Sequence, residues 1–574
     1  MPPLLRIQDL SVDFTSGSGT THALKNISLT IHRGEIVALV GESGSGKSVT
    51  SLSILQLLPA APAKYVSGQI LFSENDDEPT DLLLGDNQSL QSIRGNKIAM
   101  IFQEPMTSLN PVLTCGEQVA EAILRHKKIS TDAAKKQTIG WFEKVKLPAA
   151  ATMYNRYPHQ LSGGQKQRVM IAMAMCCHPS LLICDEPTTA LDVSVQKTIL
   201  SLIKELQQQS NMGVIFITHD LGVVAEVADR AAVMYKGEIV EENSVKEIFS
   251  NPGHPYTKAL LACRPVNHKP GERLPVVSDF LDSKSGKPIE QSIVAKAVTP
   301  APDNPGTQPV LLRAENLSVW FPAKKTFLGK PIEFIKAVDD VSFQVNKRET
   351  LGLVGESGCG KTTLGRTLLR LIEPSSGKVF YDNVDLTART KTELRSLRKD
   401  IQIVFQDPYS SLNPRLTIGS AIQEPLKVHN ILSSEKARKD KVVELLEKVD
   451  LGAAHFNRYP HEFSGGQRQR IVIARALALN PSFIVCDESV SALDVSVQAQ
   501  VLNLLNDLKK EFEFTVIFIS HDLSVVRYIS DRIMVMNKGK IEETGPAEQV
   551  YFNPRSDYTK RLIASIPKGL PAQS

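Results

Sequence analysis

Two stretches of the chain combine glycines, a lysine and a hydroxyl side chain at the spacing of a phosphate-binding loop. They are Gly41, Glu42, Ser43, Gly44, Ser45, Gly46, Lys47 and Ser48, and Gly355, Glu356, Ser357, Gly358, Cys359, Gly360, Lys361 and Thr362. Such a loop turns backbone N–H groups toward phosphate, while its lysine reaches the β- and γ-phosphates and its hydroxyl binds Mg²⁺. A single glycine-rich turn with a surface lysine could arise by chance. Two copies in matching settings predict two nucleotide sites, which extend to Val49 and Thr363.

An acidic pair follows an apolar run in each half of the chain, Asp185-Glu186 and Asp487-Glu488. A carboxylate at the C-terminal end of a buried strand near a phosphate loop is placed to hold Mg²⁺. The carboxylate after it can polarise an attacking water. In isolation such a pair would more simply cap a turn, but the phosphate loops favour the catalytic interpretation.

A third repeated motif lies about twenty residues before each acidic pair and precedes a helix-compatible segment. Its copies are Ser162, Gly163, Gly164 and Gln165, and Ser464, Gly465, Gly466 and Gln467. At a helix N-terminus this composition predicts a second anion cradle, with a simple N-cap as the alternative. Four further residues gain weight only from their repeated order: Gln103, Gln406, His219 and His521.

These motifs belong to an internal duplication, which predicts the domain organisation. Short apolar runs alternate with helical patterns in each copy, which predicts an α/β fold with a parallel-sheet core and an inserted helical subdomain. The predicted domains span residues 1–264 and 310–574, and the proline-rich segment 265–309 is expected to be a semi-rigid linker. The first copy carries extra residues around 73–87, which we expect to form a surface loop.

Composition limits the function classes. The 574 residues are 42% hydrophobic with a net charge of +4, which does not suggest a nucleic-acid partner. No run approaches the roughly 18 apolar residues of a membrane span and no signal peptide is expected, so another chain would have to cross any membrane. The seven cysteines include no C-x-x-C pair and several lie in apolar runs, which favours a reducing compartment.

The order of the motifs resembles that of the ATP-binding subunits of ABC transporters. Phosphate loop, glutamine, Ser-Gly-Gly-Gln, Asp-Glu, Ala-Leu-Asp and histidine occur in this order twice. The stretches 102–111, 405–414, 251–260 and 553–562 are similar to the dipeptide, oligopeptide and nickel importer ATPases, here with two ATPase domains fused. The resemblance implies P-loop nucleotide-binding domains, each with a RecA-like core, an antiparallel β subdomain and a helical subdomain.

The same resemblance implies roles for matching residues. It makes Glu186 and Glu488 the general bases and His219 and His521 the switch histidines. ATP and Mg²⁺ are the implied cofactors, with Mg²⁺ held by Ser48, Gln103 and Asp185 and by Thr362, Gln406 and Asp487. Asp192 and Asp494 would join the halves, which pair head to tail. Phe14 and Phe321 would stack on adenine, with His22 or Ile335 near that position.

The implied function is ATP-driven import of peptides through two membrane permease subunits, with an extracytoplasmic solute-binding protein. The chain would lie peripherally at the cytoplasmic face of the inner membrane. Import of nickel or glutathione is an alternative, and so is a soluble two-ATPase factor acting on ribosomes. Such factors usually join their halves by a long charged helix, which the prolines of 265–309 would interrupt. Because the cysteine cluster of many relatives is missing, we expect no iron–sulfur cluster.

Overall fold

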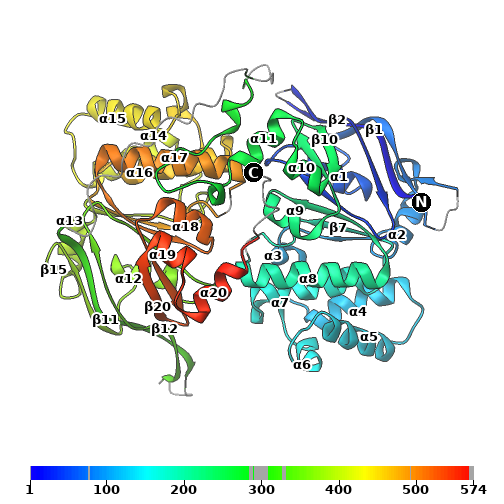
Figure 1. Ribbon diagram of the computed structural model, residues 1–574, viewed down its shortest axis with the longest axis horizontal. Helices are drawn as coiled ribbons and strands as arrows, with labels where there is room; N and C mark the ends of the chain where they lie inside the picture. Colours follow the sequence, from blue (N-terminus) through cyan, green and yellow to red (C-terminus); the bar gives the residue numbers. More distant parts are fainter. Residues whose placement is uncertain are drawn as a thin grey trace.

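The computed structural model describes residues 2–17, 19–74, 78–189, 191–282, 289, 308–325, 331–491 and 493–567. The tail 568–574 and most of the predicted linker, 283–288 and 290–307, lie outside the described residues. Within these ranges the chain forms two similar α/β units that lie side by side (Figure 1). No helix of the described ranges is long and apolar enough to cross a bilayer.

Each unit is built around a six-stranded sheet, ordered β10-β9-β3-β8-β7-β6 in the first and β16-β17-β18-β13-β19-β20 in the second. All neighbours pair in parallel except β9 with β10 and β19 with β20. The central strands are buried along their whole length, as expected when helices cover both faces of a parallel sheet. The predicted parallel core is therefore confirmed. The strands are β3 (Ile36–Val40), β6 (Ile98–Ile101), β7 (Leu181–Asp185), β8 (Gly213–Thr218), β9 (Arg230–Tyr235), β10 (Glu238–Ser244), β13 (Thr350–Val354), β16 (Ile401–Val404), β17 (Phe483–Asp487), β18 (Thr515–Ser520), β19 (Arg532–Asn537) and β20 (Lys540–Pro546).

A second, antiparallel sheet of four strands completes the β structure of each unit, as the family resemblance implied. Its strands are β1 (Pro3–Ser16), β2 (Gly19–His32), β4 (Ala63–Phe72) and β5 (Thr80–Asp81), and β11 (Val310–Lys325), β12 (Pro331–Asn346), β14 (Ser376–Tyr381) and β15 (Val384–Asp385). The expectation of a surface loop over 73–87 was wrong for its second part. There β5 pairs with β4, and Leu82 is buried because its side chain fills the core below this sheet.

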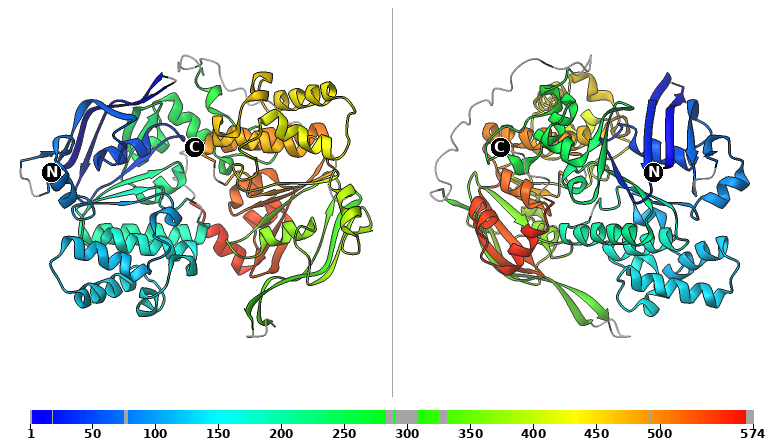
Figure 2. Two further views of the ribbon diagram at one scale, coloured as in Figure 1. Left: turned by 180° about the vertical axis from the view of Figure 1, so that it is seen from behind. Right: turned by 45° about the vertical axis from the view of Figure 1, so that its right-hand side comes forward.

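Helices of each unit gather into a helical subdomain and a set that flanks the core sheet. Helices α4 to α6 of the first unit and helices α14 and α15 of the second lie at opposite ends of the molecule. The two units are therefore oriented in opposite directions (Figures 1 and 2). The helical subdomains contain α4 (Cys115–His126), α5 (Thr131–Lys144), α6 (Ala150–Tyr154) and α7 (Gly163–Met175), and α14 (Ile418–Val428), α15 (Glu435–Lys448) and α16 (Gly465–Leu477). The other helices used below are α1 (Lys47–Ile54), α8 (Val193–Ser210), α9 (Leu221–Val227), α11 (Pro255–Ala262), α12 (Lys361–Leu368), α17 (Val495–Phe512), α18 (Leu523–Ile529) and α20 (Asp557–Ala564).

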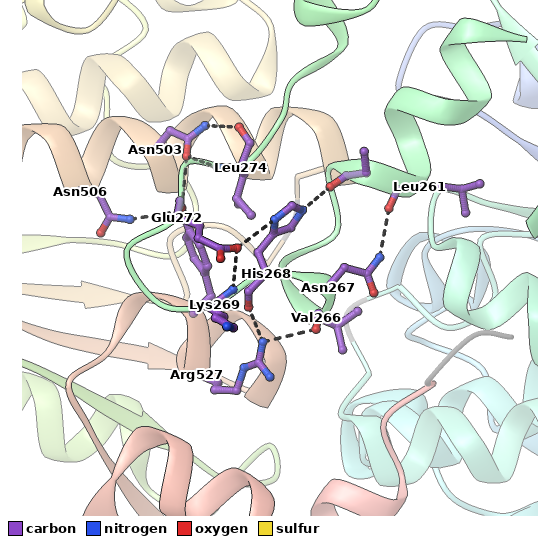
Figure 3. Close-up of polar contacts among 12 residues, drawn as sticks. Leu261, Val266, Asn267, His268, Lys269, Glu272, Leu274, Asn503, Asn506 and Arg527 are labelled. Atoms are coloured by element: carbon purple, nitrogen blue, oxygen red, sulfur yellow. Dashed lines mark hydrogen bonds and ion pairs between the residues drawn. The ribbon is translucent and has the colours of Figure 1, made fainter. Parts of the chain in front are cut away.

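Residues 265–276, predicted as the first part of the linker, pack on the second unit (Figure 3), whereas Leu281 belongs to an apolar cluster of the first unit. Two short 3₁₀ turns, Pro265–Asn267 and Val277–Asp279, flank an extended stretch. Leu274 of this stretch is 1% exposed and belongs to the same apolar cluster as the core of the second unit. This segment is therefore anchored along its length rather than spanning open solvent.

Candidate nucleotide sites

Each phosphate loop connects a central strand to a helix, β3 to α1 and β13 to α12. Gly360 closes the second loop with φ 109°, and a Cβ there would collide with the carbonyl of Ala337. The Nζ atom of Lys47 donates to the carbonyls of Gly41 (2.8 Å) and Glu42 (2.9 Å). Lys361 makes the matching contacts in the second loop, at 2.7 and 2.9 Å. Both ammonium groups are thus directed into the loop that a phosphate would enter.

Hydroxyl and carboxylate side chains meet below each loop. Ser48 Oγ donates to Asp185 Oδ1 at 3.2 Å, and Thr362 Oγ1 donates to Asp487 Oδ1 at 2.9 Å. Burial raises the pKa of both carboxyls. The Oδ2 atom of Asp487 is buried and accepts no hydrogen bond. A hydroxyl oxygen beside a carboxylate with an unused oxygen fits Mg²⁺, which prefers one or two carboxylates together with phosphate and water ligands.

Three polar side chains contact one carboxylate oxygen of Glu186. Gln103 Nε2 lies 3.2 Å and Thr189 Oγ1 2.9 Å from Oε2, and His219 Nδ1 lies 3.3 Å from the same atom. Burial alone would raise the pKa of Glu186, but the hydrogen bond and charge of His219 outweigh it, so this pKa lies below its usual value. Burial also opposes the charged form of His219, yet Glu186 raises its pKa. The glutamate is therefore kept ionised, as a general base requires.

Glu488 occupies the matching position in the second unit. Gln406 Nε2 donates to its Oε2 at 2.9 Å, and His521 Nδ1 lies 3.7 Å from that atom. Burial pushes the pKa of Glu488 upward, but the nearby His521 and the charge of Lys361 outweigh burial, so the pKa is lowered. Both glutamates have left-handed backbones, with φ of 47° at Glu186 and 48° at Glu488. Non-glycine residues rarely adopt this conformation, and its recurrence at both acidic pairs is typical of a functional position.

A cavity of about 330 Å³ opens over the second phosphate loop. It brings together most of the predicted residues of that site with one residue of the first unit, Thr189. Its lining residues are Thr189, Ala337, Ser357, Gly358, Gly360, Lys361, Thr362, Thr363, Gln406, Glu488, Ser491 and His521. The first loop also receives a residue of the opposite unit, because Ser43 N donates to Asp494 Oδ2 at 3.2 Å.

The Ser-Gly-Gly-Gln motifs are not part of this cavity. Ser162 caps α7 by accepting from Gln165 N, while Gln165 Oε1 accepts from Ser162 N at 3.1 Å. Ser464 and Gln467 form the same capping box on α16. The cap that was considered as the alternative is thus present, and a cradle for phosphate from the other unit remains a prediction.

Neither predicted adenine-stacking residue lines the cavity. Phe14 lies opposite Thr21 and packs against the core of the first unit. Phe321 is 40% exposed and lies opposite Ile335 on the neighbouring strand. Adenine stacking on either ring remains a prediction.

Two tyrosines were not predicted as site residues. The hydroxyl of Tyr256 in α11 accepts a hydrogen bond from Glu42 N at 3.0 Å. Tyr558 in α20 accepts from Glu356 N at 3.2 Å. Each tyrosine therefore supports a phosphate loop from the C-terminal part of its own unit. A signal was available, because a Tyr-Thr-Lys sequence recurs at both positions.

Comparisons with known proteins agree with this geometry. A family model described as ABC transporter matches residues 24–189 and 338–491, and one described as oligopeptide/dipeptide transporter, C-terminal region, matches residues 240–283 and 543–574. The chain is 48% identical over 571 residues to a protein named glutathione import ATP-binding protein GsiA from Pectobacterium atrosepticum, across 99% of this chain and 90% of that protein. The protein of the same name from Escherichia coli K12 is 48% identical over 575 residues, with the same coverage.

Among solved structures, the chain is similar to the ATP-binding cassette MJ0796 in a dimeric post-hydrolysis state bound to ADP and Pi. That match has 30% sequence identity and a TM-score of 0.38, and it covers 41% of this chain and 99% of the cassette. The family match covers both units, and the two relatives match the chain from end to end. The chain therefore belongs to the ABC transporter family and is an ATP-hydrolysing importer subunit that carries two ATP-binding cassettes.

Proposed function

We propose that this chain energises the import of short peptides, with glutathione, a tripeptide, as the first solute to test. The identity of 48% across nearly the whole chain to proteins named for glutathione import carries this proposal. The two matches to the oligopeptide/dipeptide C-terminal region support a peptide substrate more broadly. The chain would lie at the cytoplasmic face of the membrane, where two permease subunits and a solute-binding protein complete the importer.

Each ATP site is proposed to be shared between the units. Lys47, Ser48 and Glu186 would act with Ser464, Gly466 and Gln467, and Lys361, Thr362 and Glu488 with Ser162, Gly164 and Gln165. The contact between Ser43 and Asp494 and the position of Thr189 in the opposite cavity support this pairing. Bound Mg²⁺ would neutralise charge on the β- and γ-phosphates. Ser48, Gln103 and Asp185 would hold it in one site, and Thr362, Gln406 and Asp487 in the other.

The proton transfer is assigned to the glutamates. Glu186 and Glu488 would take a proton from the attacking water, and the neighbouring histidines would keep these carboxylates ionised and oriented. Closing the units on ATP and reopening them after hydrolysis would drive the permeases, because ATP binds the closed state more tightly.

The permeases are proposed to dock beside the two glutamines that follow β6 and β16. Val112 is 75% exposed in the first unit, and its counterpart in the second is Arg415. Leu113 and Leu416, the neighbouring apolar residues of this surface, are only partly exposed. A charge at Val112 is therefore the cleaner test. Different side chains beside similar chemistry are what two different permeases would require.

Transport by the reconstituted importer tests the proposal. Vesicles that contain the chain, its permeases and its binding protein should accumulate glutathione or a dipeptide only when ATP is present on the side of the membrane that carries the cassettes.

The docking surface has its own test. Val112→Glu should abolish uptake and permease association, while the ATPase activity of the isolated chain stays within about twofold of the wild type. Glu121→Gln, at an exposed position of α4, is the control for a change of surface charge. Accumulation of nickel but of no peptide would overturn the substrate assignment, and uptake by Val112→Glu would overturn the docking surface.

A further inference from the structure

The segment 265–274 connects the first cassette to two helices of the second, and a short set of side chains makes the attachment (Figure 3). The strongest contact is at Asn503 of α17. Its Oδ1 accepts from Leu274 N at 2.9 Å, and its Nδ2 donates to Leu274 O at 2.8 Å. Asn503 and Leu274 are 4% and 1% exposed, so this paired contact is shielded from water.

Helix α18 holds the same segment from the other side. Arg527 donates to the carbonyl of His268 and, at 3.3 Å, to that of Val266. Tyr528 OH donates to Glu272 O at 2.6 Å. These acceptors are backbone carbonyls and the donors are side chains of the second cassette. The segment adds the buried side chain of Leu274 and an ion pair between Arg273 and Asp507.

The gripping side chains occur in one cassette only. In the duplicated sequence, Asn503, Arg527 and Tyr528 correspond to Ser201, Ala225 and Glu226 of the first cassette. Ser201 is exposed and its hydroxyl bonds within its own helix, to Lys197 O. The two copies have therefore diverged at the positions that hold the segment, although the catalytic motifs beside them are nearly identical.

The contacts form a closed path that returns to the first phosphate loop. Asp494 caps α17 and accepts from Ser43 N, so the start of α17 touches this loop directly. Nine residues later, Asn503 holds the segment that continues from α11, and α11 reaches the same loop through Tyr256. At 1.5 Å per residue the two attachments lie roughly 13 Å apart along α17. A helix fixed at two separated points cannot pivot about either one.

We propose that Asn503 is a positioning residue for the first ATP site. By holding Leu274 it keeps α17, and with it Asp494, aligned on the first phosphate loop of the opposite cassette. The first site thus has a partner surface that is held by a buried paired contact. The matching path to the second loop runs from α20 through an exposed contact instead, in which Lys197 Nζ of α8 donates to Ala564 O at 2.9 Å. This inference rests on the proposed sharing of each site between the cassettes.

Closure of the two sites can be read separately with cysteine pairs. Ser43→Cys with Ser464→Cys reports the first site, and Ser357→Cys with Ser162→Cys the second. The native cysteines are all buried, so they give little background. Asn503→Ser, which copies the residue of the first cassette, should slow ATP-dependent crosslinking at the first site about tenfold and raise its KM for ATP with a smaller change in kcat. The second site should change less than twofold, and Ser201→Asn is the matched control, expected to leave both sites unchanged.

Which of the two ATP sites is impaired by Asn503→Ser distinguishes a positioning role of Asn503 from a folding defect. Asn503 lies in the cassette that carries Lys361 and Glu488, so a merely structural role would impair the second site first. Equal loss at both sites, or loss at the second alone, would overturn the proposal. Arg527→Met tests the same attachment through another residue and should reproduce the pattern. If neither cysteine pair crosslinks in the parent protein, the shared sites themselves are wrong, whereas failure of the Asn503 inference leaves the parent crosslinks intact.

Discussion

The two ATP sites share their catalytic groups but differ in the side chains that support them. In the first, Thr189 Oγ1 donates to the Glu186 carboxylate at 2.9 Å. In the second, the corresponding Ser491 donates to the backbone carbonyl of Glu488, also at 2.9 Å, and leaves the carboxylate to other donors. One extra donor on the base is therefore present in the first site only.

The second site has a cation that the first lacks. Arg366 of α12 lies one turn beyond Thr362, and its guanidinium is 3.7 Å from Asp487 Oδ2 and 5.9 Å from the centre of the Phe405 ring. Leu52 stands at the matching position of α1. The two copies have kept the nucleotide-binding motifs but differ in the residues packed behind them. Matching motifs therefore need not produce identical sites.

Removal of both bases should have the largest effect. Glu186→Gln together with Glu488→Gln should lower ATP hydrolysis by roughly 10²- to 10⁴-fold, because a general base contributes about that much. ATP binding should persist, since the phosphate loops and Mg²⁺ ligands stay intact. Steady-state phosphate release and equilibrium nucleotide binding measure the two quantities. The single variants then assign a rate to each site, and wild-type hydrolysis by the double variant would rule out the base assignment.

Thr189→Val should sharpen the comparison next. It removes the hydroxyl donor to Glu186 while keeping a similar volume, and a hydrogen bond to a charged group contributes about 1.5–3 kcal/mol. We expect a fall of about tenfold in turnover of the first site, measured with Glu488→Gln as the background. Ser491→Ala is the matched variant and should change the second site less than twofold. A larger effect of Ser491→Ala would show that the two supports are not different in function.

How far the sequence predicts these sites depends on how local each feature is. The phosphate loops and acidic pairs could be predicted because each is a continuous motif whose backbone geometry follows from its own residues. Arg366 could not, since packing between distant segments brings it to Asp487. Thr189 lies only three residues after Glu186, but its contact depends on the conformation of the turn after β7. The proline-rich composition of 265–282 correctly excludes a long helix, but it contains no information about the side chains of α17 and α18 that receive it.

Exchange of Arg366 and Leu52 should have a smaller effect, on metal affinity. A guanidinium beside Asp487 opposes a divalent cation there, although its 41% exposure lets solvent screen the charge. Exposed ion pairs contribute about 0.2–1 kcal/mol, so Arg366→Leu should tighten Mn²⁺ binding at one site by up to about fivefold. Leu52→Arg should weaken it at the other. Electron paramagnetic resonance titration of Mn²⁺ with ATP, in the variant lacking both bases, reads binding without turnover. Shifts in the same direction would contradict the charge argument.

The smallest expected effect concerns the histidines and pH. Because Glu186 raises the pKa of His219 in the folded protein above its usual 6.5, the pair stabilises the fold fully below that value. This contribution is lost as pH rises through the folded pKa. His219→Asn should therefore lower Tm by about 2 °C at pH 6, and the difference from wild type should shrink toward pH 9.

His521→Asn is the comparison variant, because His521 Nδ1 lies 3.7 Å from its glutamate, compared with 3.3 Å for His219. Thermal melts of the nucleotide-free chain at pH 6, 7.5 and 9 compare the two variants directly. A Tm difference for His219→Asn that is constant across these pH values would mean that the ion pair does not stabilise the first site. A larger loss of Tm at pH 6 for His521→Asn than for His219→Asn would reverse the order of the two sites. Either outcome would show that the hydrogen bonds from Gln103 and Thr189, rather than the charge of His219, hold Glu186 in place.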